Sequence, residues 1–363
     1  MGNDGQRVSI SALLTRDVSL DILRGLLVAL MIIMSNLGGS NYYSVLVHGY
    51  EHQSVYLAYN GLSLADIVLP LFIFVVGVTI PFSFNRRITK RESKKKMLIH
   101  IVSRTIILFG LGLLVSNFSP YVTLYNFRIM GVLQRIALCY LVASLTFMFL
   151  FYKPKWRMFS AVIIPIVYTL ILFSAPMTLA QSLPSQIDRA VLGSNHMYQD
   201  SYDPEGLLTT FSSFSTVLFG LLAGEYLVSK KAGSKVNLAI FSGLLVAMGL
   251  ILNIWIPVNK GLYTTPYMLI TNGISLGLLV LCYIIKNHAT TKPLTVLGLN
   301  AVVLYMASEL INSLLIFSGL KTIIFSSFFA NTQNGSVLYS ICYLCVFWVV
   351  AGILYWRRIF IKV

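Results

Sequence analysis

Long apolar stretches alternate with short polar ones along the whole chain, and each stretch is long enough for a membrane-spanning helix. A helix needs about 20 mostly apolar residues to cross a bilayer. Ten segments meet this requirement: residues 18–37, 64–84, 98–117, 130–152, 157–175, 207–228, 237–256, 264–285, 294–317 and 337–356. The pattern predicts an all-α integral membrane protein, with one polytopic domain of about ten transmembrane helices over residues 1–363 and the lipid bilayer as its surroundings.

The composition agrees with the pattern and excludes a water-soluble enzyme. The 363 residues are 57% hydrophobic and 11% charged, with a mean hydropathy of +0.79. Soluble domains carry about a quarter charged residues. The chemistry of this protein must therefore be sought in the few polar groups that the helices and their loops contain.

The net charge of +15 first suggests nucleic acid as a partner, but the positions of the basic residues argue against it. Outside the expected spans or at their first residue, twenty Lys and Arg lie in the two tails and the even-numbered loops, and only four lie in the odd-numbered loops. Because Lys and Arg collect on the cytoplasmic side, both termini are predicted to be cytoplasmic. The four exceptions are Arg128, Arg189, Lys260 and Lys321.

Four polar residues lie in the outer half of the expected spans, where the bilayer tolerates them poorly. Asn36 ends the first span, Asp66 begins the second, Arg135 is about a turn into the fourth, and Glu309 is four turns along the ninth. Intramembrane ionisable groups usually face a cavity or one another. They predict a water-accessible polar pocket that opens outward. The alternative is a structural buried pair of Arg135 with Asp66 or Glu309.

The outer loops also contain His48, His52 and His196. Loop histidines are most often simply solvated. An unperturbed imidazole titrates near neutrality, however, and is the usual base when an amine or hydroxyl must become nucleophilic. One of the three is a candidate base.

Seven strings, in order along the chain, resemble the heparan-alpha-glucosaminide N-acetyltransferase family. They are SLDILRG with MSNLGG (19–25 and 34–39), NGLSLADIVLPLFIFVVGVTI (60–80), RIMGVLQRIAL (128–138), IDRAVLGSNHMYQ (187–199), YDPEGLLTT (202–210), PVNKGLYT (257–264) and GLNAVVLYMASE (298–309). The resemblance implies transfer of an acetyl group from cytosolic acetyl-CoA to a sugar on the extracytoplasmic side. It also implies a multi-pass protein, for which we expect the plasma membrane.

The resemblance also implies roles for individual residues. Asn36 matches the family's Asn and would donate a hydrogen bond to the thioester oxygen, and the acids of the DPEG string are Asp203 and Glu205. The expected pocket residues that bind the sugar or orient the base are Tyr56, Asn60, Arg135, Asp203, Glu205 and Glu309. The residues expected to bind the CoA phosphates are Arg86, Arg87, Lys94, Lys95, Lys96 and Arg104, although a positive-inside signal alone explains most of them. No metal is expected, and the oligomeric state is left open, with a homodimer as one option.

The chain departs from the family at its histidines. The family's catalytic His stands four residues before the Asn that opens the second span, where this chain has Tyr56, and Ser308 replaces the His before Glu309. Three explanations stay open. The base has moved to His52 or His48; or Asp66 or Glu205 acts as the base on a different acceptor, such as a sugar hydroxyl; or the protein binds without catalysing.

A secondary transporter or permease for a sugar-like solute is the alternative function. Polar residues near the midplane and helices broken by Gly or Pro would suit a transporter, and Pro70 and Pro81 are expected to be such breaks. The sequence shows no paired, symmetry-related broken helices in its two halves, so the acyltransferase is preferred.

Overall fold

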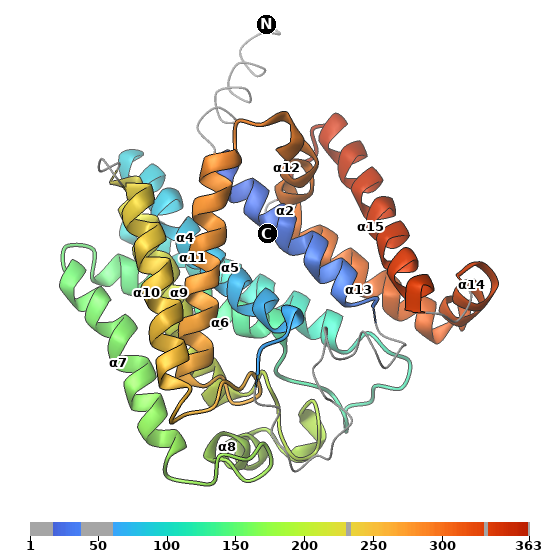
Figure 1. Cartoon of the computed structure of the whole chain (residues 1–363), viewed down its shortest axis with the longest axis horizontal. Helices are drawn as coiled ribbons and strands as arrows, with labels where there is room; N and C mark the ends of the chain where they lie inside the picture. The colour runs from blue at the N-terminus through green and yellow to red at the C-terminus, as the bar shows by residue number, and fades with distance from the viewer. Residues whose placement is uncertain (1–16, 38–60, 230–233, 330–332, 362–363) are drawn as a thin grey trace, which may run out of the picture.

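The computed structural model describes residues 17–37, 61–229, 234–329 and 333–361 (Figure 1). These residues form helices joined by turns and loops, as the all-α prediction requires. The α-helices are α2 (Val18–Met34), α4 (Leu64–Thr89), α5 (Lys94–Ser116), α6 (Val132–Phe149), α7 (Pro154–Leu172), α8 (Leu183–Val191), α9 (Leu207–Val228), α10 (Ser234–Leu252), α11 (Thr265–Ile285), α12 (Lys292–Leu299), α13 (Ala301–Phe317), α14 (Leu320–Phe328) and α15 (Gln333–Trp356). Two 3₁₀ turns, η1 (Ser194–His196) and η2 (Ala289–Thr291), complete the set.

The described helices account for each expected span. Eight are long and apolar enough to cross a membrane, and a ninth span results if the segment Ala289–Leu299 is joined to Ala301–Phe317. The first expected span is α2, which has 17 residues. The multi-span membrane fold is therefore confirmed, while the side on which the termini lie stays a prediction.

Two helices in the middle of the bundle, α4 and α9, approach so closely that only glycine fits between them. A Cβ atom on Gly220 would lie 2.1 Å from the carbonyl oxygen of Phe74, and one on Gly77 would lie 2.1 Å from that of Val217. Small residues at such contacts are typical of membrane helices, where packing rather than exclusion of water drives association. The same device joins α2 to α12, because a Cβ on Gly298 would lie 1.8 Å from the Asp21 carbonyl oxygen.

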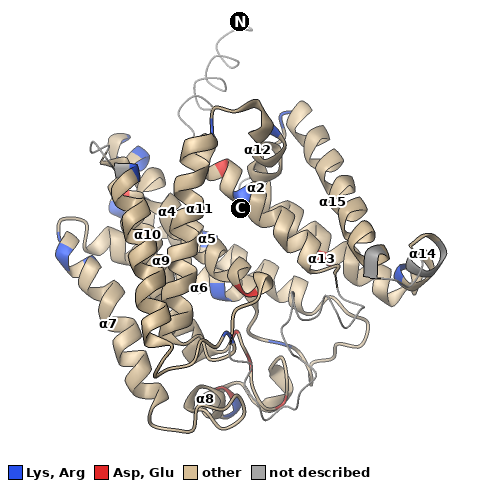
Figure 2. Cartoon of the chain, viewed as in Figure 1, with Lys and Arg blue, Asp and Glu red and all other residues tan. Residues whose placement is uncertain are grey.

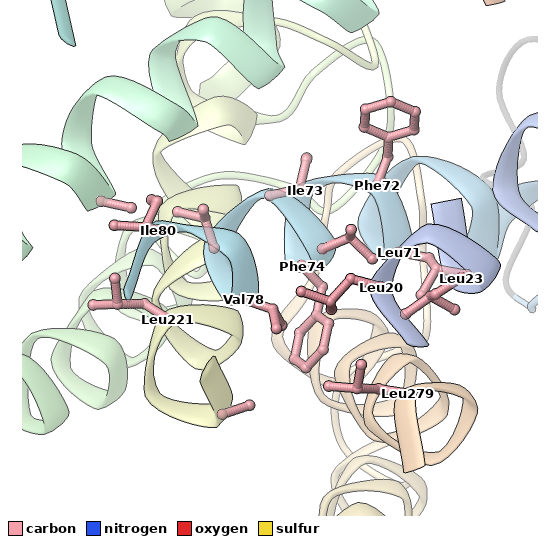
Figure 3. Close-up of a cluster of buried hydrophobic side chains, with 14 of the residues drawn as sticks. Leu20, Leu23, Leu71, Phe72, Ile73, Phe74, Val78, Ile80, Leu221 and Leu279 are labelled. Carbon is pink, nitrogen blue, oxygen red and sulfur yellow. The ribbon is translucent and has the colours of Figure 1, made fainter. Parts of the chain in front are cut away.

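Branched and aromatic side chains fill the space around these contacts. Leu23 of α2, Leu71 and Phe74 of α4, Leu221 of α9 and Leu279 of α11 are all within 1% of complete burial and belong to one cluster (Figure 3). Other large apolar side chains of α5, α7, α10 and α15 point outward and are exposed. Figure 2 shows most charged residues toward helix ends or in loops. This arrangement, with an apolar belt around a packed core, suits a protein surrounded by lipid.

The proline-containing helices are continuous, contrary to the expectation that Pro70 and Pro81 break the second span. Both prolines lie inside α4, which runs unbroken for 26 residues. A proline leaves the carbonyl four residues before it without its helical donor, and for Pro70 that carbonyl belongs to Asp66. The Tyr267 hydroxyl of α11 donates to it at 2.6 Å. A second proline, Pro165, lies inside α7. Ser215 of α9 donates at 2.6 Å to the carbonyl of Ala161, four residues before this proline.

The real break lies in the expected span 294–317, which was predicted to be continuous. The chain bends by 70° between α12 and α13, at Asn300. The Asn300 side chain donates to the Ile359 carbonyl at 3.0 Å and accepts from the Ile361 amide at 2.9 Å. The residues after α15 therefore supply hydrogen bonds at the bend. Hydropathy does not detect this break because both halves are equally apolar.

We expect Gly220→Ala to separate α4 from α9 and to lower the free energy of unfolding by about 1–3 kcal/mol, the usual cost of overpacking. Gly243→Ala in α10 is the matched control, because a Cβ there meets nothing within 4 Å. Thermal unfolding of the two variants in detergent checks the prediction. Equal melting temperatures would show that the close approach is not needed for stability.

Candidate active site

The DPEG string forms a tight turn immediately before α9, at the end of the bundle that carries α8, here called the α8 end. Asp203 shapes this turn, because its Oδ1 accepts the Glu205 amide at 2.9 Å and its Oδ2 accepts the Tyr198 amide at 2.9 Å. The Gly206 amide donates to the Asp203 carbonyl at 3.1 Å. The Asp203 carboxylate is thereby fixed by local backbone donors before any charged partner is considered.

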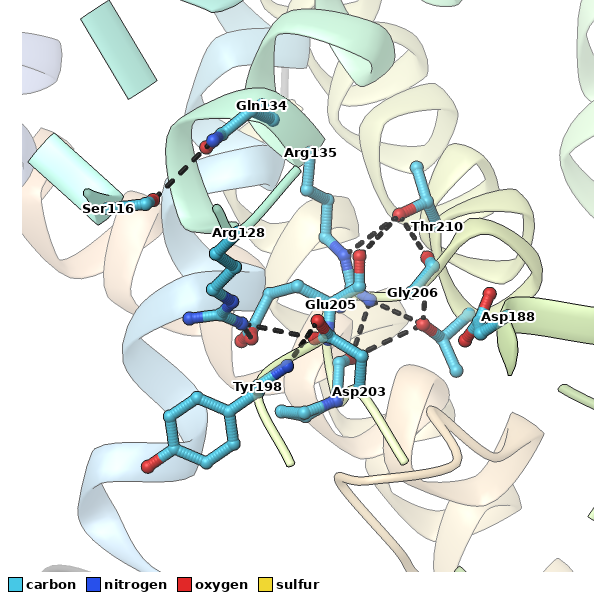
Figure 4. Close-up of polar contacts among 12 residues, drawn as sticks. Ser116, Arg128, Gln134, Arg135, Asp188, Tyr198, Asp203, Glu205, Gly206 and Thr210 are labelled. Carbon is cyan, nitrogen blue, oxygen red and sulfur yellow. Dashed lines mark hydrogen bonds and ion pairs between the residues drawn. The ribbon is translucent and has the colours of Figure 1, made fainter. Parts of the chain in front are cut away.

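Arg128 pairs with both acids of this turn (Figure 4). Its Nη2 lies 3.0 Å from Asp203 Oδ1 and 2.7 Å from Glu205 Oε2, and its guanidinium carbon lies 4.8 Å from the centre of the Tyr198 ring. Burial lowers the pKa of Arg128, but the two carboxylates outweigh that effect and hold it above its ordinary value. Burial raises the pKa of Asp203 despite the guanidinium. Sequence reasoning counted Arg128 only as a loop charge.

Arg135, at 1% exposure, is held by neutral oxygen atoms and not by a carboxylate. It donates to the Pro204 carbonyl at 2.6 Å, to Thr209 Oγ1 at 2.5 Å and to Thr210 Oγ1 at 3.2 Å. Its guanidinium carbon lies 5.3 Å from the centre of the Tyr263 ring. The proposed pairing of Arg135 with Asp66 or Glu309 is therefore wrong, since its Nε and Nη2 donate to three oxygen atoms around the DPEG turn, while the two acids are bonded elsewhere.

Asp66 instead joins the start of α4 to the segment before α11. Its Oδ1 lies 3.0 Å from Lys260 Nζ, and its Oδ2 accepts the Ser63 amide at 2.8 Å as part of a capping box. Both carboxylate oxygens are engaged, which suits a residue that fixes the helix start more than a free base. Lys260 comes from the PVNKGLYT string, where Asn259 Oδ1 accepts the Leu262 amide at 3.0 Å.

Asn36 and Glu309 lie in a second polar cluster, at the end of α2. Ser35 Oγ donates to Glu309 Oε1 at 2.8 Å, and Asn36, at 2% exposure, donates from Nδ2 to the Ile32 carbonyl at 2.8 Å. Lys321 of α14 donates to Asn36 Oδ1 at 3.4 Å. Tyr305 of α13 lies within electrostatic range of Glu309 in this cluster and also of Glu205 and Arg128 at the DPEG turn.

The four Lys and Arg that are exceptions to the positive-inside pattern are all engaged at these sites. Arg128 pairs with Asp203 and Glu205, Lys260 pairs with Asp66, Lys321 binds Asn36, and Arg189 donates to the carbonyls of Ala180 and Ser201 at 2.8 and 2.6 Å. Their very rarity in the outer loops was the signal that could have identified them. The threonines that hold Arg135 had no such signal.

Of the candidate histidines, only His196 falls within the described part of the chain. Its Nδ1 lies 2.7 Å from the Phe127 carbonyl, next to Arg128, and its own carbonyl accepts the Ile129 amide at 3.3 Å. The predicted bases His48 and His52, and the predicted pocket residues Tyr56 and Asn60, lie outside the described residues.

At the opposite end of the bundle, the structure brings together only some of the residues expected to bind CoA phosphates. Arg87 and Arg104 both lie within electrostatic range of His100. Arg87 pairs with Glu92 at 2.9 Å, and the Arg104 guanidinium carbon lies 4.6 Å from the centre of the Tyr140 ring. The side chains of Arg86, Lys94, Lys95 and Lys96 are exposed.

Two comparisons with known proteins agree with the resemblance found in the sequence. A family model described as heparan-alpha-glucosaminide N-acetyltransferase, catalytic, matches residues 16–190. The chain is 26% identical over 360 residues to the mouse protein of that name, covering 81% of this chain and 53% of the relative. It is 26% identical over 367 residues to the human one, covering 83% and 54%. The resemblance to this family is confirmed, and the chain spans about half the length of these curated relatives.

Asp188 of α8 gives the fold a distinct pH dependence. Its Oδ1 accepts the Leu207 amide at 2.8 Å at the start of α9, while Oδ2 is buried without a hydrogen-bond partner in the described structure. Burial raises the pKa of Asp188 from 3.8 to about 6. A raised pKa favours the protonated folded state, so this contribution to stability is full below about pH 4 and is lost as the pH rises through about 6.

We therefore expect Asp188→Asn, which mimics the neutral acid, to melt progressively higher than the original protein as the pH rises from 4 to 7. The difference should level off above that range. The matched control is Asp200→Asn, because Asp200 is exposed. Melting curves at a series of pH values give the measurement, and parallel pH profiles for Asp188→Asn and the original protein would contradict the assignment.

Proposed function

We propose that this chain is a membrane-embedded acyltransferase of the cell membrane that moves an acetyl group from acetyl-CoA to an extracytoplasmic sugar. The observation that carries the proposal is the pair of polar clusters that an otherwise apolar bundle contains, both within electrostatic range of Tyr305. They combine an amide donor with an arginine–carboxylate group. The names of the curated relatives support acetyl transfer to an amino sugar. A sugar hydroxyl stays open as the acceptor.

In this proposal the acceptor attacks the thioester carbonyl directly, and negative charge develops on its oxygen. A positioned amide N–H stabilises such a charge. Asn36 suits this role because one Nδ2 hydrogen is used by the Ile32 carbonyl and the amide carries a second. The base that deprotonates the acceptor is assigned to His52 or His48.

The Arg128 group is proposed to bind the sugar. Hydroxyl and amino groups of a sugar need acceptors as well as donors, and Glu205 and Arg128 offer both while retaining 10% and 20% side-chain exposure. Asp203 has 0% side-chain exposure and is fully bonded, so its proposed role is to hold Arg128 in place. Arg135 is proposed to fix the DPEG turn in place through its bonds to the Pro204 carbonyl and to the two threonine hydroxyls. The Tyr198 ring is available for stacking against a pyranose.

Acetyl-CoA is proposed to enter at the opposite end, which the charge pattern predicts to be cytoplasmic. Its phosphates carry several negative charges, and Arg87 and Arg104 at that end both lie within electrostatic range of His100. The exposed Lys94, Lys95 and Lys96 of the first turn of α5 add positive charge there. The pantetheine arm would then extend between the helices toward Asn36.

Transport of a sugar-like solute is the second candidate, because the 70° bend between α12 and α13 is a broken span. Broken helices in transporters usually come in pairs related by symmetry. The described part of the chain contains one such bent pair. We therefore place acetyl transfer first.

Purified protein given radiolabelled acetyl-CoA and a panel of amino sugars and neutral sugars should release CoA and label a sugar. In liposomes, label should reach a sugar confined to the side opposite the CoA. A parallel vessel without acceptor measures background hydrolysis. Uptake of unmodified sugar without any consumption of acetyl-CoA would instead support the transporter.

Asn36→Ala should reduce the rate of acetyl transfer by about 10² or more if its amide stabilises the developing oxyanion. Binding of CoA should be unchanged, because the phosphates are proposed to bind at the other end. A control asparagine must have no structural bond of its own. Asn253 does not meet this requirement, because its Oδ1 accepts the Val258 amide at 2.8 Å. Asn195→Ala is suitable, because Asn195 is exposed on η1. A threefold effect of Asn36→Ala would indicate packing.

A further inference from the structure

Three consecutive residues at the end of α2 are each bonded to a different helix of the last third of the chain. Ser35 donates to Glu309 of α13 at 2.8 Å, Asn36 accepts from Lys321 of α14 at 3.4 Å, and the Leu37 carbonyl accepts from Ser336 of α15 at 3.1 Å. The last turn before residue 38 is therefore fixed from three directions. Of the three contacts, only that of Lys321 reaches the side chain proposed to contact the thioester.

The local fold places Lys321 over Asn36. Gly319, with a φ of +69°, adopts the left-handed conformation that glycine tolerates best, and it turns the chain from α13 into α14. Lys321 Nζ then donates to Asn312 Oδ1 at 2.8 Å, and it lies 5.8 Å from the centre of the Tyr339 ring. Asn312 anchors the ammonium group, so that the contact with Asn36 does not depend on a freely moving lysine.

Two contacts fix which way the Asn36 amide faces: the Ile32 carbonyl accepts from Nδ2 at 2.8 Å, and the Lys321 ammonium group donates to Oδ1 at 3.4 Å. An ammonium only donates hydrogen bonds, so it must face the amide oxygen and not the amide nitrogen. With Oδ1 facing Lys321, the Nδ2 atom faces away from it. A positive charge beside Oδ1 also draws electron density from the nitrogen, which makes its N–H a better hydrogen-bond donor.

We propose that Lys321 is a positioning residue for acyl transfer, which holds the Asn36 amide with Nδ2 presented to the thioester carbonyl and strengthens that donor. The inference rests on the proposed function, and it adds a charged residue whose place in the outer loops the positive-inside pattern does not explain. Lys321 does not touch the substrate. Its proposed effect on the thioester passes through Asn36, although its charge also acts on Glu309. A test must therefore measure the coupling of Lys321 to Asn36.

The test is a double-mutant cycle on acetyl transfer with Asn36→Ala, Lys321→Met and the combined variant. Lys321→Met keeps most of the stem but removes the charge, and we expect it to lower kcat by about tenfold or more with little change in the KM for acetyl-CoA. Lys321→Arg keeps the charge and should restore part of the rate. The combined variant should be no slower than Asn36→Ala, because the proposal assigns the effect of Lys321 on the reaction to the Asn36 amide.

Lys155→Met serves as the control for loss of a lysine, because Lys155 is exposed at the start of α7 and belongs to neither polar cluster. A melting temperature for each variant separates loss of the fold from misplacement of the Asn36 amide in a folded protein. If Lys321→Met does not fold, Asn312→Ala removes the anchor of the ammonium group and should lower kcat in the same direction.

The outcomes are distinct. A wild-type chain that binds acetyl-CoA but acetylates no sugar overturns the proposed function, and this assignment falls with it. An active wild type overturns the assignment alone in either of two cases. One is that Lys321→Met, or Asn312→Ala where it replaces that variant, keeps the full kcat. The other is that the effects of Lys321→Met and Asn36→Ala multiply in the combined variant, as expected for a lysine that acts only on stability or elsewhere.

Discussion

Backbone polar groups inside this bundle must find their partners within the protein, because lipid offers none. This constraint explains contacts that the apolar core alone would not require. The carbonyls released by Pro70 and Pro165 each receive a hydroxyl from a neighbouring helix, Tyr267 and Ser215 respectively. The prolines therefore do not break α4 and α7. They tie each helix to a neighbour, and the same tie brings α11 against the start of α4, beside the Asp66–Lys260 pair.

The constraint also explains how charges are arranged at the α8 end. Arg128, Asp203 and Glu205 form one group, and Arg135 lies behind it among neutral oxygens. Two arginines and two acids thus lie in this small region, with Arg128 paired to both acids and Arg135 bound by neutral oxygen atoms of the same turn and of α9. A site of this kind can offer both donors and acceptors to a polar ligand without an uncompensated charge in the bilayer.

The sequence predicted much of this and missed the rest for physical reasons. Apolar length located the helices, because crossing a bilayer requires it. Hydropathy did not locate the bend at Asn300, because the break lies between two apolar segments and is bonded by Ile359 and Ile361, far along the chain. Asn36, Arg135 and Glu309 were identified by their cost in the membrane, but their partners were not. Charge alone suggested that Arg135 pairs with an acid, whereas the threonine hydroxyls and a turn carbonyl hold it.

The matched family segment, residues 16–190, contains Asn36, Arg128 and Arg135, while the other side chains that bind them lie beyond it. Asp203 and Glu205 follow shortly after this segment, while Glu309 and Lys321 lie on helices of the last third of the chain. The first half thus supplies polar side chains that would be costly in the membrane on their own, and the second half supplies their partners. The close contact of α2 with α12 at Gly25 and Gly298 joins the two halves. Since Asn36 follows directly after α2, the packing at the start of this helix and the geometry of the proposed site beyond its end are linked through one helix.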